Sequence, residues 1–102
     1  MRDAKVIPTM DRGVSADRGV SAAIRRFPRR SLEIRRLAVA DGSFRSLCGD
    51  LREAEEALER WNRIPSDQAV SRREEYNLLV EELAREIEGI VDRRARAEYG
   101  AR

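Results

Sequence analysis

Residues 44–61 read FRSLCGDLREAEEALERW, and their apolar side chains recur at alternating intervals of three and four residues. The positions in this pattern are Phe44, Leu47, Leu51, Ala54, Leu58 and Trp61. Such intervals place side chains along one side of an α-helix, as in helices that pack lengthwise against another helix. Towards the N-terminus the pattern continues through Ala40 and Leu37. The stretch therefore predicts a long helix with an apolar seam.

Signals for the beginning and end of helices surround this seam. A short helix is expected over residues 31–40, followed by a second helix over 43–63. Asp41 and Ser43 are both candidates for the N-cap of the second helix, because their side chains can accept hydrogen bonds from its free N–H groups. Pro65 ends that helix, since proline lacks the N–H group that a helix interior needs.

A second apolar seam follows the proline. It consists of Tyr76, Val80, Leu83, Ile87 and Ile90, again at intervals of three and four residues. Ser66 and Ser71 are both N-cap candidates for this third helix, which we expect over residues 67–94. Two seams joined by so short a connection meet only if the helices fold back on each other. The predicted fold is therefore all-α: an antiparallel helical hairpin, coiled-coil-like, with a short preceding helix.

The seams also indicate a partner. We expect the core of the hairpin, or its interface with a partner, to contain Leu37, Phe44, Leu47, Leu51, Leu58, Trp61, Tyr76, Val80, Leu83, Ile87 and Ile90. These eleven apolar side chains contribute little compared with the conformational entropy lost when two long helices become ordered. We therefore expect a homo-oligomer, with a dimer favoured, or a complex with another helical protein.

The charges divide the chain into a basic and an acidic part. Residues 1–36 carry ten Lys or Arg and four Asp or Glu, whereas residues 37–90 carry seven and thirteen. The arginines that we consider as phosphate contacts are Arg25, Arg26, Arg29, Arg30, Arg35 and Arg36. Phe27 is the only aromatic residue among them, so binding of nucleic acid would be weak and independent of sequence.

The basic part contains a tandem repeat. The hexapeptide DRGVSA occupies residues 11–16 and again residues 17–22. Each copy has one sizeable apolar residue, which is too little to bury a face. We therefore expect residues 1–30 to be a disordered Arg-rich arm, residues 31–95 to be a helical-hairpin domain and residues 96–102 to be a frayed tail. Two alternatives for the arm are an organellar transit peptide and a misassigned start codon.

The residue inventory excludes several kinds of site. The chain has no histidine and a single cysteine, Cys48, which excludes a histidine-based triad, a histidine zinc ligand and an intrachain disulfide. We therefore expect no catalytic residue, metal or cofactor, and no enzymatic activity. No apolar run approaches 18 residues and no signal-peptide pattern follows the early charges, so we expect a cytoplasmic protein without a membrane span.

The seam residues also carry a resemblance to a family. A leucine, a turn with Asp, a Phe-x-x-Leu motif and a later leucine of the heptad are found here as Leu37, Asp41, Phe44, Leu47 and Leu58. Residues 83–87 read LAREI where that family has LKDEI. In this respect residues 32–91 resemble the YdcH-like family of small bacterial proteins, although Leu51 replaces an aromatic residue and Ala54 a leucine. The resemblance implies a helical hairpin and implies no activity, because the family is a domain of unknown function.

Two hypotheses for function follow. The first is a structural or protein-interaction module that associates with itself. The second is a nonspecific nucleic-acid accessory protein that binds phosphates through its basic arm.

Overall fold

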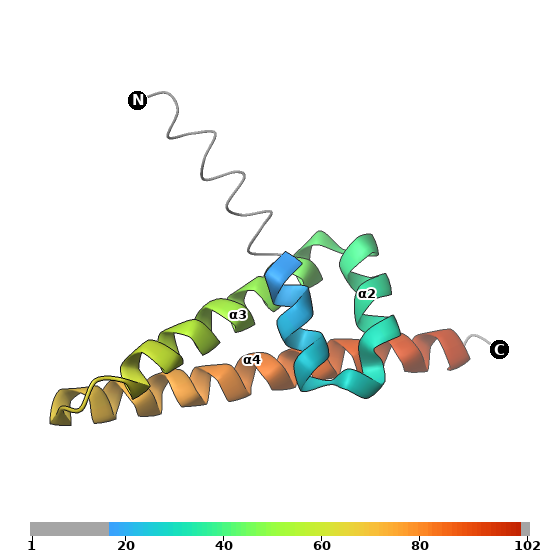
Figure 1. Ribbon diagram of the computed structural model, residues 1–102. Coiled ribbons are helices and arrows are strands. Elements are labelled where there is room, and N and C mark those ends of the chain that lie inside the picture. The colour runs from blue at the N-terminus through green and yellow to red at the C-terminus, as the bar shows by residue number, and fades with distance from the viewer. Residues whose placement is uncertain (1–16, 101–102) are drawn as a thin grey trace.

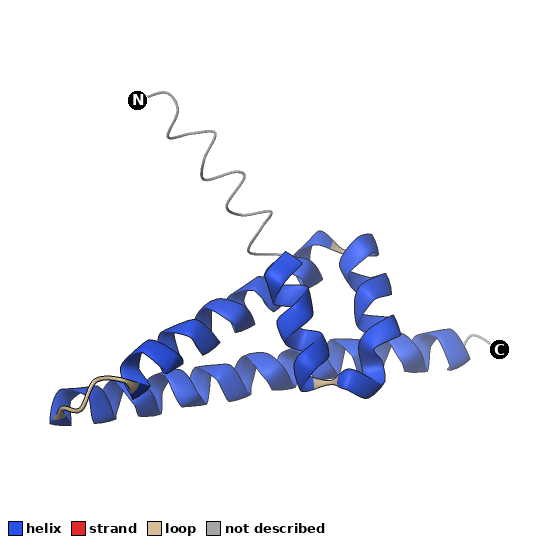
Figure 2. Ribbon diagram, viewed as in Figure 1, coloured by secondary structure: helices blue, strands red, loops and turns tan. Residues whose placement is uncertain are grey.

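The computed structural model of the protein describes residues 17–100, which form helices and short connections (Figure 1). No strand occurs within these residues, so the all-α prediction is confirmed for them (Figure 2). The elements are an N-terminal helix that covers residues 17–26, the 3₁₀ turn η1 (Pro28–Arg30), α2 (Ser31–Ala40), α3 (Gly42–Asn62) and α4 (Asp67–Gly100).

Helix α3 begins at a side-chain cap. The carboxylate of Asp41 accepts hydrogen bonds from the backbone N–H groups of Ser43 (2.9 Å) and Phe44 (3.2 Å). These two bonds satisfy donors that have no partner inside the helix. Of the two candidates for the N-cap, Asp41 is therefore the one used, and the bounds of α3 lie within one residue of the predicted 43–63.

A short turn joins α3 to α4, and both of its sides are held by hydrogen bonds. Ser66 Oγ accepts a bond from the N–H group of Ala69 (3.3 Å), which makes Ser66 rather than Ser71 the cap of α4. The Arg73 side chain donates to the carbonyl oxygens of Trp61 (3.2 Å) and Ile64 (3.0 Å), each of which also accepts a backbone N–H group of the turn. The two long helices run antiparallel from this turn (Figure 1).

The core lies at the other end of the hairpin, where the N-terminal helix and α2 meet α3 and α4 (Figure 1). Its largest fully buried side chains are Phe44, Ile34, Leu51, Ile87 and Cys48. No buried side chain within residues 17–98 is polar or charged. Burial of apolar surface is therefore the main force that holds the helices together.

The expected disordered arm is wrong for residues 17–30, which form the N-terminal helix and η1. Ala22 and Ala23 of this helix are buried in the core, with exposed fractions of 1% and 0%. Residues 1–16, and with them the first copy of the repeat, lie outside the described residues. The second copy forms the first part of the N-terminal helix.

Small residues explain why this segment is ordered. A Cβ atom placed on Gly19 would overlap the backbone of Cys48 and Gly49 in α3. Because Gly19 lacks a side chain, the two helices approach until their backbones touch. A repeat without large apolar residues thus docks by close contact of small residues.

Two further predictions need correction. Ala40, which was expected to belong to the seam, is exposed, although the break between the short helix and α3 lies at Asp41 as predicted. The expected tail at 96–102 is helical as far as Gly100, where α4 ends. Residues beyond Gly100 lie outside the described part.

The molecule is thin. The described chain measures 55 × 39 × 16 Å along its principal axes. Packed helix axes lie about 8–10 Å apart, so the shortest dimension corresponds to at most two layers of helices. The N-terminal helix lies across one face of the hairpin, and the opposite face has no helix of this chain over it within residues 17–100 (Figures 1 and 2).

Candidate interaction surface

Two arginines attach the basic segment to the acidic hairpin. Arg26 contacts Glu81 of α4 (Nη2 to Oε2, 2.7 Å) and lies 3.8 Å from Glu55 of α3. Arg30 contacts Asp92 of α4 (Nη1 to Oδ1, 2.7 Å) and Glu33 of α2 (Nε to Oε1, 2.7 Å). Part of the charge asymmetry of the sequence is therefore neutralised within the chain itself.

Two ionisable groups at the contact between the basic segment and the hairpin have shifted pKa values. Burial raises the pKa of Glu55, and the positive charges of Arg26, Arg25 and Arg52 offset only part of that shift. The hydrogen bonds that Arg30 makes with carboxylates raise the pKa of its guanidinium, which keeps it charged at every pH of interest.

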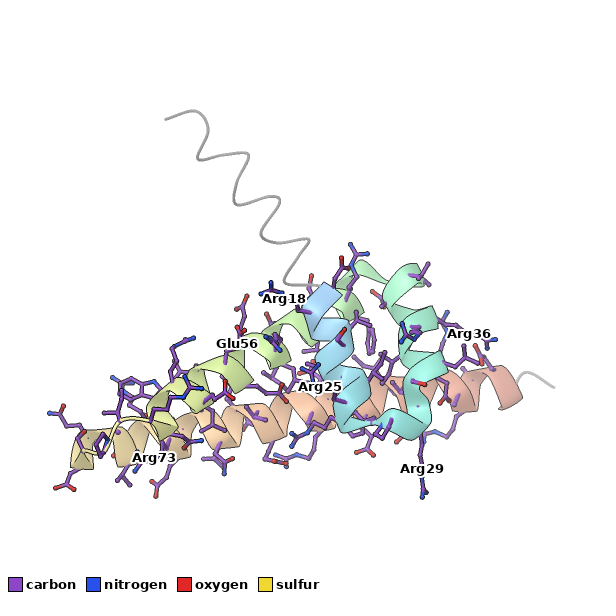
Figure 3. All side chains as sticks on the ribbon, in the orientation of Figure 1. Arg18, Arg25, Arg29, Arg36, Glu56 and Arg73 are labelled. Carbon is purple, nitrogen blue, oxygen red and sulfur yellow. The ribbon has the colours of Figure 1, made fainter. Side chains whose placement is uncertain are left out.

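The six arginines proposed as phosphate contacts do not gather in one place. Arg26 and Arg30 are held by carboxylates, as described above. The other four, Arg25, Arg29, Arg35 and Arg36, are exposed and have no ion pair within residues 17–98. Figure 3 shows Arg25 beside the hairpin, Arg29 pointing away below η1 and Arg36 on the far side of α2. They form a dispersed positive surface and not a single binding site.

The predicted seam residues divide into two groups. Those buried within the single chain are Leu37, Phe44, Leu51, Val80 and Ile87. Those half-buried are Leu47, Leu58, Trp61, Tyr76, Leu83 and Ile90. The first group forms the core and is not available to a partner, whereas the second leaves apolar surface in water.

Part of the second group lines a groove of about 440 Å³ between α3 and α4. We call it the hairpin groove. Its apolar residues are Ala54 and Ala57 from α3 and Tyr76, Leu79 and Leu83 from α4. Its charged residues, all from α3, are Asp50, Glu53 and Arg60.

The hairpin groove lies on the face turned away from the N-terminal helix. Ala57 follows Cys48 by nine residues, which is about two and a half turns of helix, so the two residues point in opposite directions. Cys48 is next to Gly19 of the N-terminal helix. Nothing in the described part of the chain therefore covers the groove.

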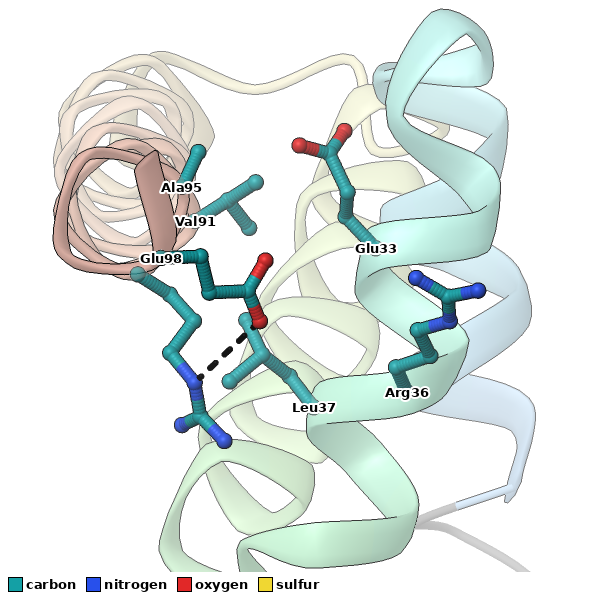
Figure 4. Close-up of a pocket in the computed structure, with 7 residues that line it drawn as sticks. Glu33, Arg36, Leu37, Val91, Ala95 and Glu98 are labelled. Carbon is teal, nitrogen blue, oxygen red and sulfur yellow. Dashed lines mark ion pairs between the residues drawn. The ribbon is translucent and has the colours of Figure 1, made fainter. Parts of the chain in front are cut away.

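A second hollow lies between α2 and the end of α4, and Figure 4 shows it in close-up. Leu37 and Val91 form its apolar wall, and Arg94 and Glu98 pair across its rim (Nε to Oε2, 3.9 Å). Its volume of about 40 Å³ holds about one water molecule. It is too small for an organic ligand.

The described residues show no metal site, membrane span or reactive thiol. No group of three or more His, Cys, Asp or Glu residues within residues 17–98 is placed to hold a metal ion. No helix in this part of the chain is long and apolar enough to cross a membrane. The one cysteine, Cys48, is buried, and burial raises the pKa of its thiol to about 11. At neutral pH this thiol is protonated and unreactive.

No family model, no curated protein and no solved structure matches the chain. The resemblance to the YdcH-like family therefore stays a prediction.

Sequence reasoning missed Gly19 and Gly49, which bring the N-terminal helix into contact with α3. The signal for this contact was the spacing of small residues at Gly19, Ala22 and Ala23, which share one side of a helix. Sequence reasoning also assigned no role to Ala57, at the centre of the hairpin groove.

Proposed function

We propose that the protein is an interaction module that self-associates through the hairpin groove. The observation that carries the proposal is that the apolar side chains of the groove remain partly exposed to water in the single chain. Leu79 is 38% exposed, and Tyr76 and Leu83 are half-buried. A contiguous apolar surface bordered by charged residues is typical of a protein interface. The proposal includes no enzymatic activity, metal or cofactor.

The thin shape supports this proposal. One face of the hairpin is covered by the N-terminal helix, and the groove on the other face still exposes apolar side chains. A second helical layer on the groove would complete a bundle around these side chains. We place the module in the cytoplasm, a compartment in which a free cysteine such as Cys48 stays reduced.

Adjacent leucines of α4 offer a matched test. Leu79 lines the groove, whereas Leu78 is 64% exposed outside it. Leu79→Asp places a carboxylate in the interface and should convert a concentration-dependent oligomer into a monomer, while Leu78→Asp should not. Sedimentation equilibrium measures the association, and circular dichroism verifies that both variants remain helical. A wild-type protein that is monomeric up to about 0.1 mM would contradict the proposal.

The second candidate function is nonspecific binding of nucleic acid. The observation that favours it is the exposure of Arg25, Arg29, Arg35 and Arg36, with no carboxylate partner within residues 17–98. With four phosphate contacts instead of six, log affinity for single strands should fall with log salt at a slope of roughly −3.

Fluorescence anisotropy of single-stranded RNA and duplex DNA at several salt concentrations tests this candidate. A variant with glutamine at the four exposed arginines is the appropriate comparison. Deletion of residues 1–30 is not, because it would remove Ala22 and Ala23 from the core. We expect binding that disappears near physiological salt. Submicromolar binding that persists at about 150 mM salt and is lost in the glutamine variant would favour nucleic acid over self-association.

A further inference from the structure

We propose that the hairpin groove is occupied by a second copy of this chain in antiparallel orientation, with α3 packed on α3 and Ala57 next to the two-fold axis. This inference rests on the proposed function and adds the geometry of the interface and the residues that determine its orientation.

The centre of the groove is suited to close contact with another helix. Ala54 and Ala57 are small residues on the floor of the groove, and with exposed fractions of 4% and 7% they add little apolar area of their own. Small side chains at the point of closest approach let two helix axes come to the near end of the usual 8–10 Å range. Leu79 and Leu83 flank this point from α4 and supply the apolar area.

The order of charges along α3 determines the orientation of the partner. Glu53 precedes Ala57 by four residues and Arg60 follows it by three. At about 1.5 Å per residue they lie about 6 Å and about 4.5 Å on opposite sides of Ala57. Rotation by a two-fold axis near Ala57 brings Glu53 of one copy opposite Arg60 of the other, twice in each dimer.

The alternative orientation has no such complementarity. In a parallel contact Glu53 would face Glu53 and Arg60 would face Arg60, and like charges in contact are unfavourable. Asp50, which lies beyond Glu53 on the same side of Ala57, adds to this repulsion. None of these three residues has an ion-pair partner within residues 17–98, so their charges remain available to a partner.

The available area is consistent with a specific but modest dimer. Helix α3 has 21 residues and is therefore about 31 Å long. Two helices side by side are about 20 Å wide, which gives about 600 Å² of face per copy, at the low end of stable interfaces. We therefore expect dissociation constants in the micromolar range and a strong dependence on protein concentration.

Charge reversal tests the orientation. Glu53→Arg and Arg60→Glu should each raise the dissociation constant at least about tenfold, because each turns two attractive pairs of the dimer into repulsive ones. The double variant restores opposite charges and should return to within about threefold of the wild type. Glu59→Arg, on the same helix but outside the groove, is the matched control and should leave the constant unchanged. Sedimentation velocity at low salt measures all four.

Disulfide trapping gives an independent readout. A mixture of Glu53→Cys and Arg60→Cys proteins should oxidise to a heterodimer, whereas each variant alone should cross-link much less. Cys48 is buried and does not interfere. Efficient cross-linking of Glu53→Cys alone, or a dimer insensitive to both charge reversals, would overturn the antiparallel geometry and leave self-association standing. A wild-type protein that is monomeric throughout would overturn the proposed function as well.

Discussion

A single methyl group added at Gly19 is expected to destabilise the fold, although alanine is the better helix former. In an exposed helix, replacement of glycine by alanine is favourable by about 1 kcal/mol. Here the new Cβ atom would overlap the backbone of Cys48 and Gly49, which cannot turn aside as a flexible side chain can. Overpacking of this kind costs about 1–3 kcal/mol, and more where backbone must move. The net expectation is a loss of about 1–2 kcal/mol of unfolding free energy.

Denaturation followed by circular dichroism measures this loss. For a domain of this size the thermal midpoint should fall by about 5–15 °C. The Cys48 thiol supplies a second readout, because it is fully buried next to Gly19 and becomes accessible to thiol reagents if the N-terminal helix moves away. Gly42→Ala is the control, since a Cβ atom there meets nothing within 4 Å. A Gly19→Ala protein as stable as the wild type, with unchanged thiol labelling, would refute the docking of the N-terminal helix.

Three further predictions concern stability. Asp41→Ala removes the cap of α3 and should lower the unfolding free energy by about 1 kcal/mol, whereas Ser43→Ala should have little effect; urea titration compares them. Arg30→Ala breaks two partly shielded ion pairs and should cost about 0.5–1 kcal/mol in the same assay, and Arg72→Ala, in an exposed pair, should cost almost nothing. Burial raises the pKa of Cys48 from 9.0 to about 11, so the unfolded chain loses this proton first as the pH rises. Below about pH 9 this group should therefore not affect the unfolding free energy, and between about pH 9 and 11 the unfolding free energy should fall by about 2–3 kcal/mol. Stability measured as a function of pH tests this, because the Cys48→Ala variant should lack the fall.

The two long helices could be predicted because their signals are local. The intervals of three and four residues, the cap at Asp41 and the stop at Pro65 all act over a few residues, and α3 and α4 begin within one residue of the predicted positions. The division of the seams between core and groove could not be predicted. Ile87 and Leu83 follow the same pattern in the sequence, yet one is fully buried and the other is half-buried, because their exposure depends on which face the N-terminal helix covers.

The N-terminal helix was missed for a related reason. Its contacts with the hairpin join residues far apart in the sequence, such as Arg26 and Glu81, which are 55 positions apart. Its docking depends on the absence of a side chain at Gly19, and a glycine in a short polar repeat is more often the sign of a flexible segment. The unpaired charges of the hairpin groove had no sequence signal of their own, because Glu53 and Arg60 are indistinguishable by pattern from other charged residues on α3.

The tandem repeat gives the N-terminal helix a second possible register on α3, and the residues that follow the repeat distinguish the two. Residues 11–16 and 17–22 are identical, so a slip of six positions would place Gly13 where Gly19 now contacts the backbone of α3. The residues that follow the repeat unit would change, however. Asp17 would take the place of Ala23, which is 0% exposed, and Arg18 and Ser21 would take the places of Ile24 and Phe27, which pack against the core. A carboxylate without a partner at that position costs several kcal/mol. The duplicated hexapeptide thus leaves one alignment of the chain favoured, and Asp17→Ala would make the two alignments degenerate at this position.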